Sequence, residues 1–358
     1  MHGIQPKRVV SSSSPRRSAR PPYRTAPVPP PPTKGVSCFI VKLRTYEPSD
    51  LPHLAEVWND CFSGGPNFVR LDEADLRRRV IEQPSFDPTC LLVAGHGAQV
   101  LGFAHFGPRT NLWTRPADRR VDREEGHIYV VVADPSDRPL LRDLLAAAAE
   151  RLTEAGARRL LLGPSWVYGT QPFYNGIAGA YETPGLSAAR GDLLELAGES
   201  GFAPLAEYGT PELHLSDGGH LTALRERASR LWERSGESEL RGRARPLPSP
   251  FFPGRNSVEL VRGHGVVAAA AYGPWPEYAR EHGRSLFGIT SVQVAPGWRG
   301  RGLAKLIVIQ ALEAALKAGA EALHLHVWRG NKPAWNLYHR ALGFRPRFTW
   351  LTLAKQLD

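Results

Sequence analysis

A short run of glycine and arginine, Arg299-Gly300-Arg301-Gly302, stands between a β-branched segment and a long apolar segment. The first amides of a helix lack partners and carry partial positive charge, and glycines let the backbone approach a phosphate closely. Arg299 and Arg301 add cationic groups suited to phosphate oxygens. The run therefore predicts a pyrophosphate-binding loop. A solvated basic turn that starts a helix is the alternative, because short glycine motifs often occur without a ligand.

The elements around this loop must position it. Residues 289–294 are rich in β-branched side chains and predict a strand that leads into the loop. A helix is expected from near Gly302 to Gly319, where glycine provides the C-terminal stop. Residues 322–328 alternate in polarity and predict a second strand, which a helix carrying Tyr338 follows.

This order of motifs resembles the GNAT acetyltransferase superfamily. The family pattern has a strand ending V-x-P, then R/Q-x-x-G-x-G/A at the start of a helix. A second strand, an asparagine, and a helix with tyrosine ahead of L-G-F follow. The matching residues are Val294-Ala295-Pro296, Arg299-x-x-Gly302-x-Ala304, Asn331, and Tyr338 before Leu342-Gly343-Phe344. The likeness covers roughly residues 287–352, and Ala304 at the third small position is a variant that the family allows.

The resemblance implies that acetyl-CoA is the cosubstrate and that a primary amine attacks its acetyl group directly in a ternary complex. The residues it assigns to cofactor binding are Val292, Gln293, Val294, Arg299, Gly300, Arg301, Gly302, Leu303, Ala304, Asn331 and Tyr338. Tyr338 takes the family's role of general acid, unless it is a core tyrosine. Asn331 is expected either to contact the pantetheine arm or simply to cap the next helix. A backbone N–H near Val292 is expected to stabilise the oxyanion.

The general base stays open, because residues 289–294 contain no carboxylate and the Gln293 amide does not accept a proton usefully. His324 and His326 alternate along the next predicted strand and so face the same way. Either imidazole is a candidate base, directly or through water. The alternative for each is an ordinary surface or core histidine with no role in catalysis. Glu277 and His282 are weaker candidates.

An internal repeat precedes this region. The segment from Val132 to Leu162 aligns with the segment that holds the loop, but it is two residues shorter where the glycines would stand. Its counterpart of the loop has no glycine, and Asp137 would repel phosphate while Pro139 lacks an N–H. The repeat therefore predicts a first domain of the same kind that has lost cofactor binding. A first domain that binds through another loop is the alternative.

Between the fifth predicted strand and the last predicted helix of this first domain, residues 163–185 form a long aromatic and glycine-rich loop. Its aromatic side chains are expected either to line a pocket at the domain junction or to pack there as a plug. These side chains are Tyr168, Phe173, Tyr174 and Tyr181.

Charge is concentrated at the start of the chain. The formal net charge is +10, and residues 1–36 contain seven basic residues and no acidic one. This segment is rich in proline and serine, so it is predicted to be a disordered tail. It is interpreted as a solvated extension, as an arm that binds nucleic acid weakly, or, against its prolines, as a transit peptide.

The rest of the composition predicts a cytoplasmic protein. The three cysteines, Cys38, Cys61 and Cys90, form no C-x-x-C pair, which argues against a disulfide framework or a zinc site. No apolar run approaches the roughly 20 residues of a membrane span. No metal is expected, and the oligomeric state, monomer or dimer, is open.

Together these features predict an α/β fold (α+β, mixed sheet) with two tandem domains. The expected parts are a tail over 1–36, a degenerate GNAT-like domain over 37–217 and a catalytic GNAT domain over 218–358. The acceptor is expected to be a small-molecule or peptide amine. An alternative of another class is a non-catalytic module that senses CoA and uses its basic tail to contact a partner or nucleic acid.

Overall fold

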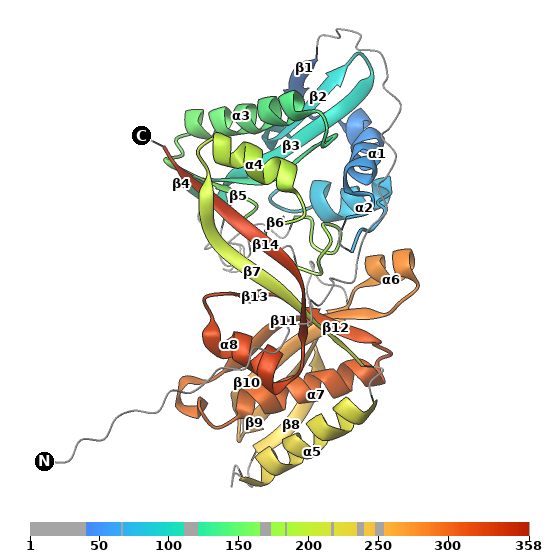
Figure 1. The fold of residues 1–358 in the computed structure, drawn as a ribbon, viewed down its shortest axis with the longest axis vertical. Helices are drawn as coiled ribbons and strands as arrows, with labels where there is room; N and C mark the ends of the chain where they lie inside the picture. The colour runs from blue at the N-terminus through green and yellow to red at the C-terminus, as the bar shows by residue number, and fades with distance from the viewer. Residues whose placement is uncertain are drawn as a thin grey trace, which may run out of the picture. The chain divides into compact units, whose positions relative to one another are not determined.

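The order strand, helix, two strands, helix, strand occurs twice along the chain, once over residues 121–214 and again over residues 286–356 (Figure 1). The computed structural model describes residues 41–65, 67–110, 121–164, 173–182, 185–215, 218–234, 240–247 and 254–357. The predicted tail over 1–36 lies outside these residues. Within them, no helix combines the length and the apolar character that a bilayer crossing requires.

The first half begins with a strand, two helices and a three-stranded meander. Its elements are β1 (Lys42–Thr45), α1 (Leu51–Phe62), α2 (Glu73–Leu76), β2 (Leu91–His96), β3 (Gln99–Thr110), β4 (Val121–Ala133), α3 (Arg138–Glu154), β5 (Arg159–Leu162), β6 (Leu186–Ser187), α4 (Gly191–Glu199) and β7 (Ala203–His214). Leucines at helical spacing bury one face of α3 against β3 and β4.

The second half begins with a helix, three strands and another helix, and it repeats the order of the first half from residue 286 onward. Its elements are α5 (Gly218–Arg234), β8 (Leu240–Pro246), β9 (Asn256–Arg262), β10 (Gly265–Pro274), α6 (Pro276–His282), β11 (Leu286–Val294), α7 (Leu303–Lys317), β12 (Ala322–Leu325), β13 (Val327–Trp328), α8 (Lys332–Asn336) and β14 (Arg345–Gln356). Helix α7 packs on β9, β10 and β11 and is largely buried, because both its core face and much of its flanks are apolar.

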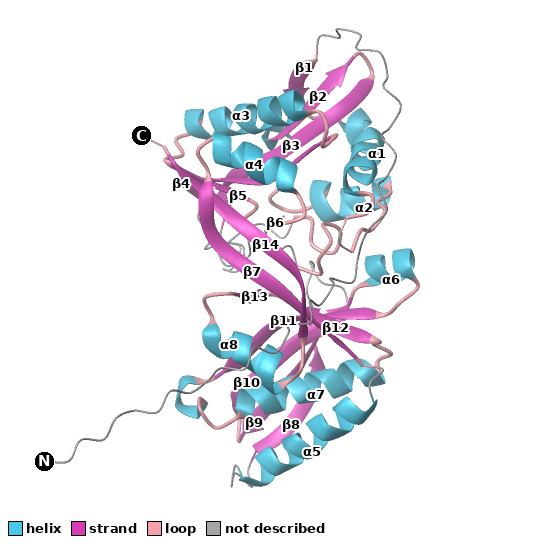
Figure 2. Cartoon of the chain, in the orientation of Figure 1, coloured by secondary structure: helices cyan, strands magenta, loops and turns pink. Residues whose placement is uncertain are grey.

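All strands of the described residues belong to one mixed sheet (Figure 2). Its order is β1-β2-β3-β4-β5-β14-β7-β12-β11-β10-β9-β8, with β6 beside β14 and β13 beside β7. The pairs β4–β5 and β11–β12 are parallel, and the others are antiparallel. The predicted fold class, α/β with a mixed sheet, is confirmed.

The last strand of each half pairs with the sheet of the other half. Strand β14 lies beside β5 in the register Leu353↔Leu162 to Gln356↔Arg159. Strand β7 lies beside β12 in the register Ala322↔His214 to His324↔Glu212. Strands β7 and β14 also pair with each other. The domain boundary between 217 and 218 stays a prediction, but any cut there separates strands that are hydrogen-bonded to each other.

The described part of the aromatic loop, residues 173–182, is packed against elements of the second half. Phe173, Tyr174 and Tyr181 are buried in one apolar cluster with Trp275 and Tyr278. The Trp275 indole N–H donates to the Gly176 carbonyl at 2.7 Å. The rings of Phe173 and Tyr174 contact His105 and Trp58 of the first half. Packing as a plug between the halves is thus confirmed for Tyr181, whose ring lies on Gly288, whereas Tyr168 lies outside the described residues.

Candidate active site

The start of α7 has the backbone geometry expected of an anion-binding loop. Gly300 and Gly302 have φ angles of +79° and +81°, in the left-handed region that glycine tolerates best. Gly302 is the N-cap and offers no side chain to accept the first amides of the helix. Within the described part of the chain, the amides of Leu303 and Ala304 therefore have no acceptor, and a bound anion can take that role.

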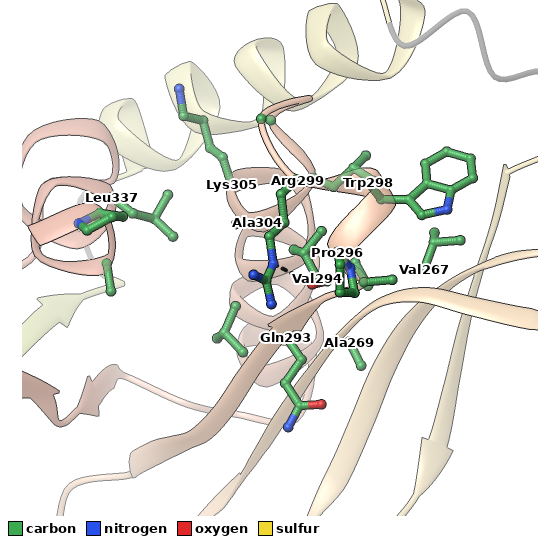
Figure 3. A pocket seen from close by; sticks show the side chains of 18 of the residues that line it. Val267, Ala269, Gln293, Val294, Pro296, Trp298, Arg299, Ala304, Lys305 and Leu337 are labelled. Atoms are coloured by element: carbon green, nitrogen blue, oxygen red, sulfur yellow. Dashed lines mark hydrogen bonds between the residues drawn. The ribbon is translucent and has the colours of Figure 1, made fainter. Parts of the chain in front are cut away.

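A cavity of about 1000 Å³ lies over this helix start and over the end of β11 (Figure 3). Ten of the eleven residues predicted to bind the cofactor line it, Arg301 being the exception. Lys305 also lines the cavity and adds a cationic group that the sequence motif did not indicate. The predicted cofactor residues are thus brought together at one place.

The two loop arginines differ in position. The Arg299 Nε–H donates to the Val294 carbonyl at 3.2 Å, and Figure 3 shows its guanidinium between α7 and β11. The Arg301 guanidinium instead lies 4.9 Å from the centre of the Trp298 ring, a cation–π distance. Arg299 therefore faces the cavity, whereas Arg301 covers a tryptophan at its edge.

A second cavity, of about 820 Å³, lies where β11 and β12 diverge. Their parallel pairing ends at Ile289↔Leu325, although β11 continues to Val294 beside β10. Beyond Ile289, one edge of β11 thus has no strand partner among the described residues. Val292, on this free segment, lines both cavities, as expected for a backbone that contacts a reacting group.

Tyr338 also lines both cavities. It lies in the π-helical turn Leu337–Ala341 and is 6% exposed, with its ring 5.7 Å from that of Phe344. Burial raises the pKa of the Tyr338 phenol well above its ordinary value. The hydroxyl therefore keeps its proton at neutral pH, which suits a proton donor.

Asn331 makes the helix cap that was one of its two expected roles. Its Oδ1 accepts the Ala334 N–H at 3.2 Å at the start of α8. Asn331 nevertheless lines both cavities and is exposed. Its amide N–H groups make no hydrogen bond within the described residues, so capping leaves them available to a ligand.

His324 lies outside both cavities. It is completely buried, and its Nε2 accepts the Tyr181 backbone N–H at 3.3 Å. Since a backbone amide only donates, Nε2 is unprotonated and is already used as an acceptor. Burial lowers the pKa of His324 to about 3. In this arrangement the imidazole holds the aromatic loop and has no free lone pair for a substrate.

His326 lines the second cavity, and its ring centre is 5.3 Å from that of His324. Its Nδ1 is 2.8 Å from the Thr210 hydroxyl, which accepts the Trp350 indole N–H at 2.7 Å. Because the Thr210 hydroxyl oxygen already accepts from Trp350, its O–H is free to donate to His326 Nδ1. The proton of the neutral imidazole then lies on Nε2. Burial and then His324 lower the pKa of His326. His326 is thus set up as a neutral donor more than as a base.

The two weaker candidates for the base also have partners. Glu277 is 2% exposed and forms ion pairs with Arg79 and Arg78 of the first half. The His282 Nε2 lies 2.8 Å from the Phe68 carbonyl, so it is the protonated donor of a structural hydrogen bond. Neither side chain lines the second cavity.

Glu182 is a lining residue that sequence reasoning missed. It ends the described stretch 173–182 of the first half, is 7% exposed and lines the second cavity with Arg255. Burial raises the pKa of its carboxyl to about 8, and the nearby Arg255 opposes part of that rise. The only sequence signal was its place in an unusually long loop, because no local pattern links residue 182 to residues 290–338.

The start of α3 differs from the start of α7 in the side chain at its N-cap. Asp137 is the N-cap of α3, and its Oδ1 accepts the Leu140 N–H at 3.1 Å. Pro139 contributes no N–H. A carboxylate of the chain itself therefore occupies the helix start where α7 leaves amides open.

Comparisons with known proteins bear on the family and the fold. Residues 222–344 match the family model described as the Acetyltransferase (GNAT) family. A search of curated proteins gave no match. Among solved structures, the chain is similar to a tandem GNAT protein from the clavulanic acid biosynthesis pathway. That likeness has a TM-score of 0.60 at 12% identity and covers 88% of this chain and 98% of the other.

It is also similar to a GCN5-related N-acetyltransferase from Sphaerobacter thermophilus. The TM-score is 0.55 at 14% identity, over 88% of this chain and 95% of the other. At these identities the structural likeness establishes the fold, and the family model covers the second half. By that model and that fold, residues 222–344 belong to the GNAT acetyltransferase superfamily, within a chain that has the fold of a tandem GNAT protein.

Proposed function

We propose that the chain is an N-acetyltransferase that uses acetyl-CoA and transfers the acetyl group to a primary amine in its second half. The start of α7 carries this proposal. Two left-handed glycines, the open amides of Leu303 and Ala304, and the side chains of Arg299 and Lys305 line one cavity. These groups fit a diphosphate, because they offer donors and positive charge without side-chain bulk.

Acetyl-CoA, when bound, would supply an acetyl group activated as a thioester. The chain's own residues would do the rest. The Tyr338 hydroxyl is the proposed proton donor to the departing sulfur, which leaves as a thiol with a pKa of roughly 8.5. Amides on the free edge of β11 near Val292 are the proposed donors to the developing oxyanion. The Asn331 amide is the proposed contact for the pantetheine arm.

The shape of the site supports direct attack in a ternary complex. Val292, Gln293, Asn331, Ala334 and Tyr338 line both cavities. A donor in the larger cavity and an amine in the smaller one would therefore meet at the same side chains. Simultaneous binding of both reactants favours one direct transfer over a covalent relay through the protein.

For the first half we infer that no cofactor binds. The Asp137 carboxylate already accepts a leading amide of α3, and it would repel phosphate. This part of the proposal predicts that each chain binds one acetyl-CoA. A cytoplasmic location and a small-molecule or peptide amine acceptor stay predictions from the sequence.

Calorimetric titration with acetyl-CoA, followed by thiol release across a panel of primary amines, tests the proposal. We expect one binding site and a thiol release that depends on an amine. Binding without release over the whole panel would favour the CoA-sensing alternative. Two equivalent sites would contradict the inference about the first half.

A further inference from the structure

One buried carboxylate in the second cavity differs from the others. Seven Asp and Glu side chains of the described residues are buried: Asp50, Asp75, Glu125, Glu182, Glu212, Glu259 and Glu277. Six of them have a close side-chain nitrogen partner: Glu212 Oε1 lies 2.9 Å from His214 Nε2, and the other five form an ion pair with arginine. Glu182 forms none with any described residue, although charge burial without a partner is costly.

The loop that carries Glu182 is fixed in place by its neighbour. The Tyr181 ring lies on Gly288 of β11, where an added Cβ would be only 2.0 Å from its Cδ1. The Tyr181 N–H is hydrogen-bonded to His324 of β12. Gly288 and His324 are partners in the parallel register just before β11 and β12 diverge. Tyr181 therefore sets Glu182 at the point where the second cavity opens.

We propose that Glu182, supplied by the first half, binds the ammonium group of the acceptor and is the general base of the second half's reaction. This inference rests on the proposed function and names the group that the sequence left open. A buried carboxylate without a cationic partner is suited to a ligand that brings its own positive charge. Such a site selects primary ammonium compounds as acceptors.

The proton and bond changes balance. The bound ammonium passes one proton to a Glu182 Oε, and the freed nitrogen lone pair forms the C–N bond as the C–S bond breaks. The departing sulfur takes the proton of the Tyr338 hydroxyl. The second proton of the nitrogen restores the tyrosine, and Glu182 returns its proton to solvent. No oxidant, reductant or metal enters this sequence.

The neighbours of Glu182 determine its pH behaviour. The other titratable or charged side chains that line the second cavity are Arg109, Tyr208, Arg255, His326 and Tyr338. Burial lowers the pKa of His326 and raises that of Tyr338, so both stay neutral near pH 7. Of the two lining arginines, Arg109 pairs with Glu125, and Arg255 is the cation that lowers the pKa of Glu182. An ionised Glu182 thus meets only partial compensation until an ammonium group arrives.

The decisive experiment compares the full-length native chain with Glu182→Gln, using the best acceptor of the amine panel. We expect unchanged acetyl-CoA binding and a kcat at pH 7 lower by about 100-fold or more, the usual range for a general base. The loss should shrink to under about tenfold near pH 10, where amines deprotonate without help. A merely structural role would give the same deficit at both pH values.

Glu277→Gln is the control, because Glu277 is equally buried but paired with Arg79. It should alter stability without changing the shape of the pH profile. A Glu182→Gln variant within threefold of native activity at pH 7 would overturn the assignment of the base while leaving the proposed function intact. A native chain that acetylates no amine would overturn the proposed function and this inference with it.

A second measurement needs no acceptor. Burial raises the pKa of the Glu182 carboxyl to about 8 in the folded chain, from its ordinary value of 4.5. The protonated Glu182 carboxyl therefore contributes fully to the free energy of unfolding below pH 4.5. This contribution is lost as pH rises through about 8, because the buried carboxyl must then ionise. Glu182→Gln should unfold at a higher temperature than the native chain above pH 8, with the gap closing toward pH 4.5. A lower unfolding temperature above pH 8 would show that the carboxylate is paired.

Discussion

At the scale of single residues, burial determines the protonation state of Tyr338. The ring packs on Phe344 inside the second half's core, and the side chain lines the two cavities at once. Because burial raises the pKa of this phenol, Tyr338 keeps its proton at neutral pH and still holds it when the sulfur departs.

Tyr338→Phe removes the hydroxyl and keeps the ring. We expect kcat to fall by about 10²-fold or more, the usual contribution of a general acid, while acetyl-CoA affinity changes little. Thiol release gives the first quantity and calorimetry the second. An equal fall in both would mean that the tyrosine only supports the fold.

The sequence predicted some of these residues well and others not at all. The glycines, Asn331 and Tyr338 follow each other in one motif, so local order was enough to find them. The histidines were predicted to face the same way, and their rings do lie close together. Their hydrogen bonds to Tyr181 and Thr210 come from strands and loops more than 100 residues away, which no local pattern specifies.

At the scale of elements, α3 and α7 are one helix used in two ways. Both begin after a strand of the sheet and pack their apolar face on it. A single side chain at the N-cap separates them, since Asp137 fills the helix start of α3 and Gly302 leaves that of α7 open. The start of α3 thus shows that an N-cap carboxylate can accept the amides that α7 leaves without an acceptor.

Gly302→Glu would give α7 a carboxylate at this position. We expect it to abolish acetyl-CoA binding in a calorimetric titration, because the new charge can accept the open amides and repels phosphate. Strain from a φ of +81° should add a cost of roughly 1–2 kcal/mol to folding.

Gly319→Ala provides the control for that strain. Gly319 has a φ of +89° at the other end of α7, outside both cavities. The control should lower stability by a similar amount and leave acetyl-CoA affinity unchanged. Loss of binding in both variants would mean that α7 itself, and not its first amides, holds the ligand.

The ends of helices and strands were predicted correctly where a glycine marks them. Helix α7 begins after Gly302 and ends before Gly319, as expected. The strand predicted over 322–328 is interrupted at His326, because β12 pairs with β11 whereas β13 pairs only with β7. No strand was expected over β8, whose composition is poor in β-branched residues, and its pairing with β9 over Leu240–Pro246 decides its conformation.

At the scale of the whole molecule, the exchanged strands join the two halves. Strand β14 needs β5 and β7 as neighbours, and β12 needs β7. Sequence repetition predicted two copies of one plan, but the strand order depends on pairings between residues almost 200 positions apart. Such pairings leave no trace in local periodicity.

A chain limited to residues 218–358 should therefore fail to fold, because β12 and β14 would both lose the strand β7 that pairs with them and would have unpaired edges. Size-exclusion chromatography and circular dichroism should show aggregated or unfolded material. Coexpression with residues 41–217 should restore a soluble complex that binds acetyl-CoA. A monomeric, ligand-binding 218–358 fragment would contradict this account.

The strand exchange also bears on the history of the repeat. After a duplication, a copy that no longer works is normally free to decay or to be deleted. Here the copy with Asp137 at its helix start contributes β7 to its sister's sheet and receives β14 in return. Under the proposed function, selection on the half that binds acetyl-CoA would therefore also act on the half that does not, because each half holds a strand of the other's sheet.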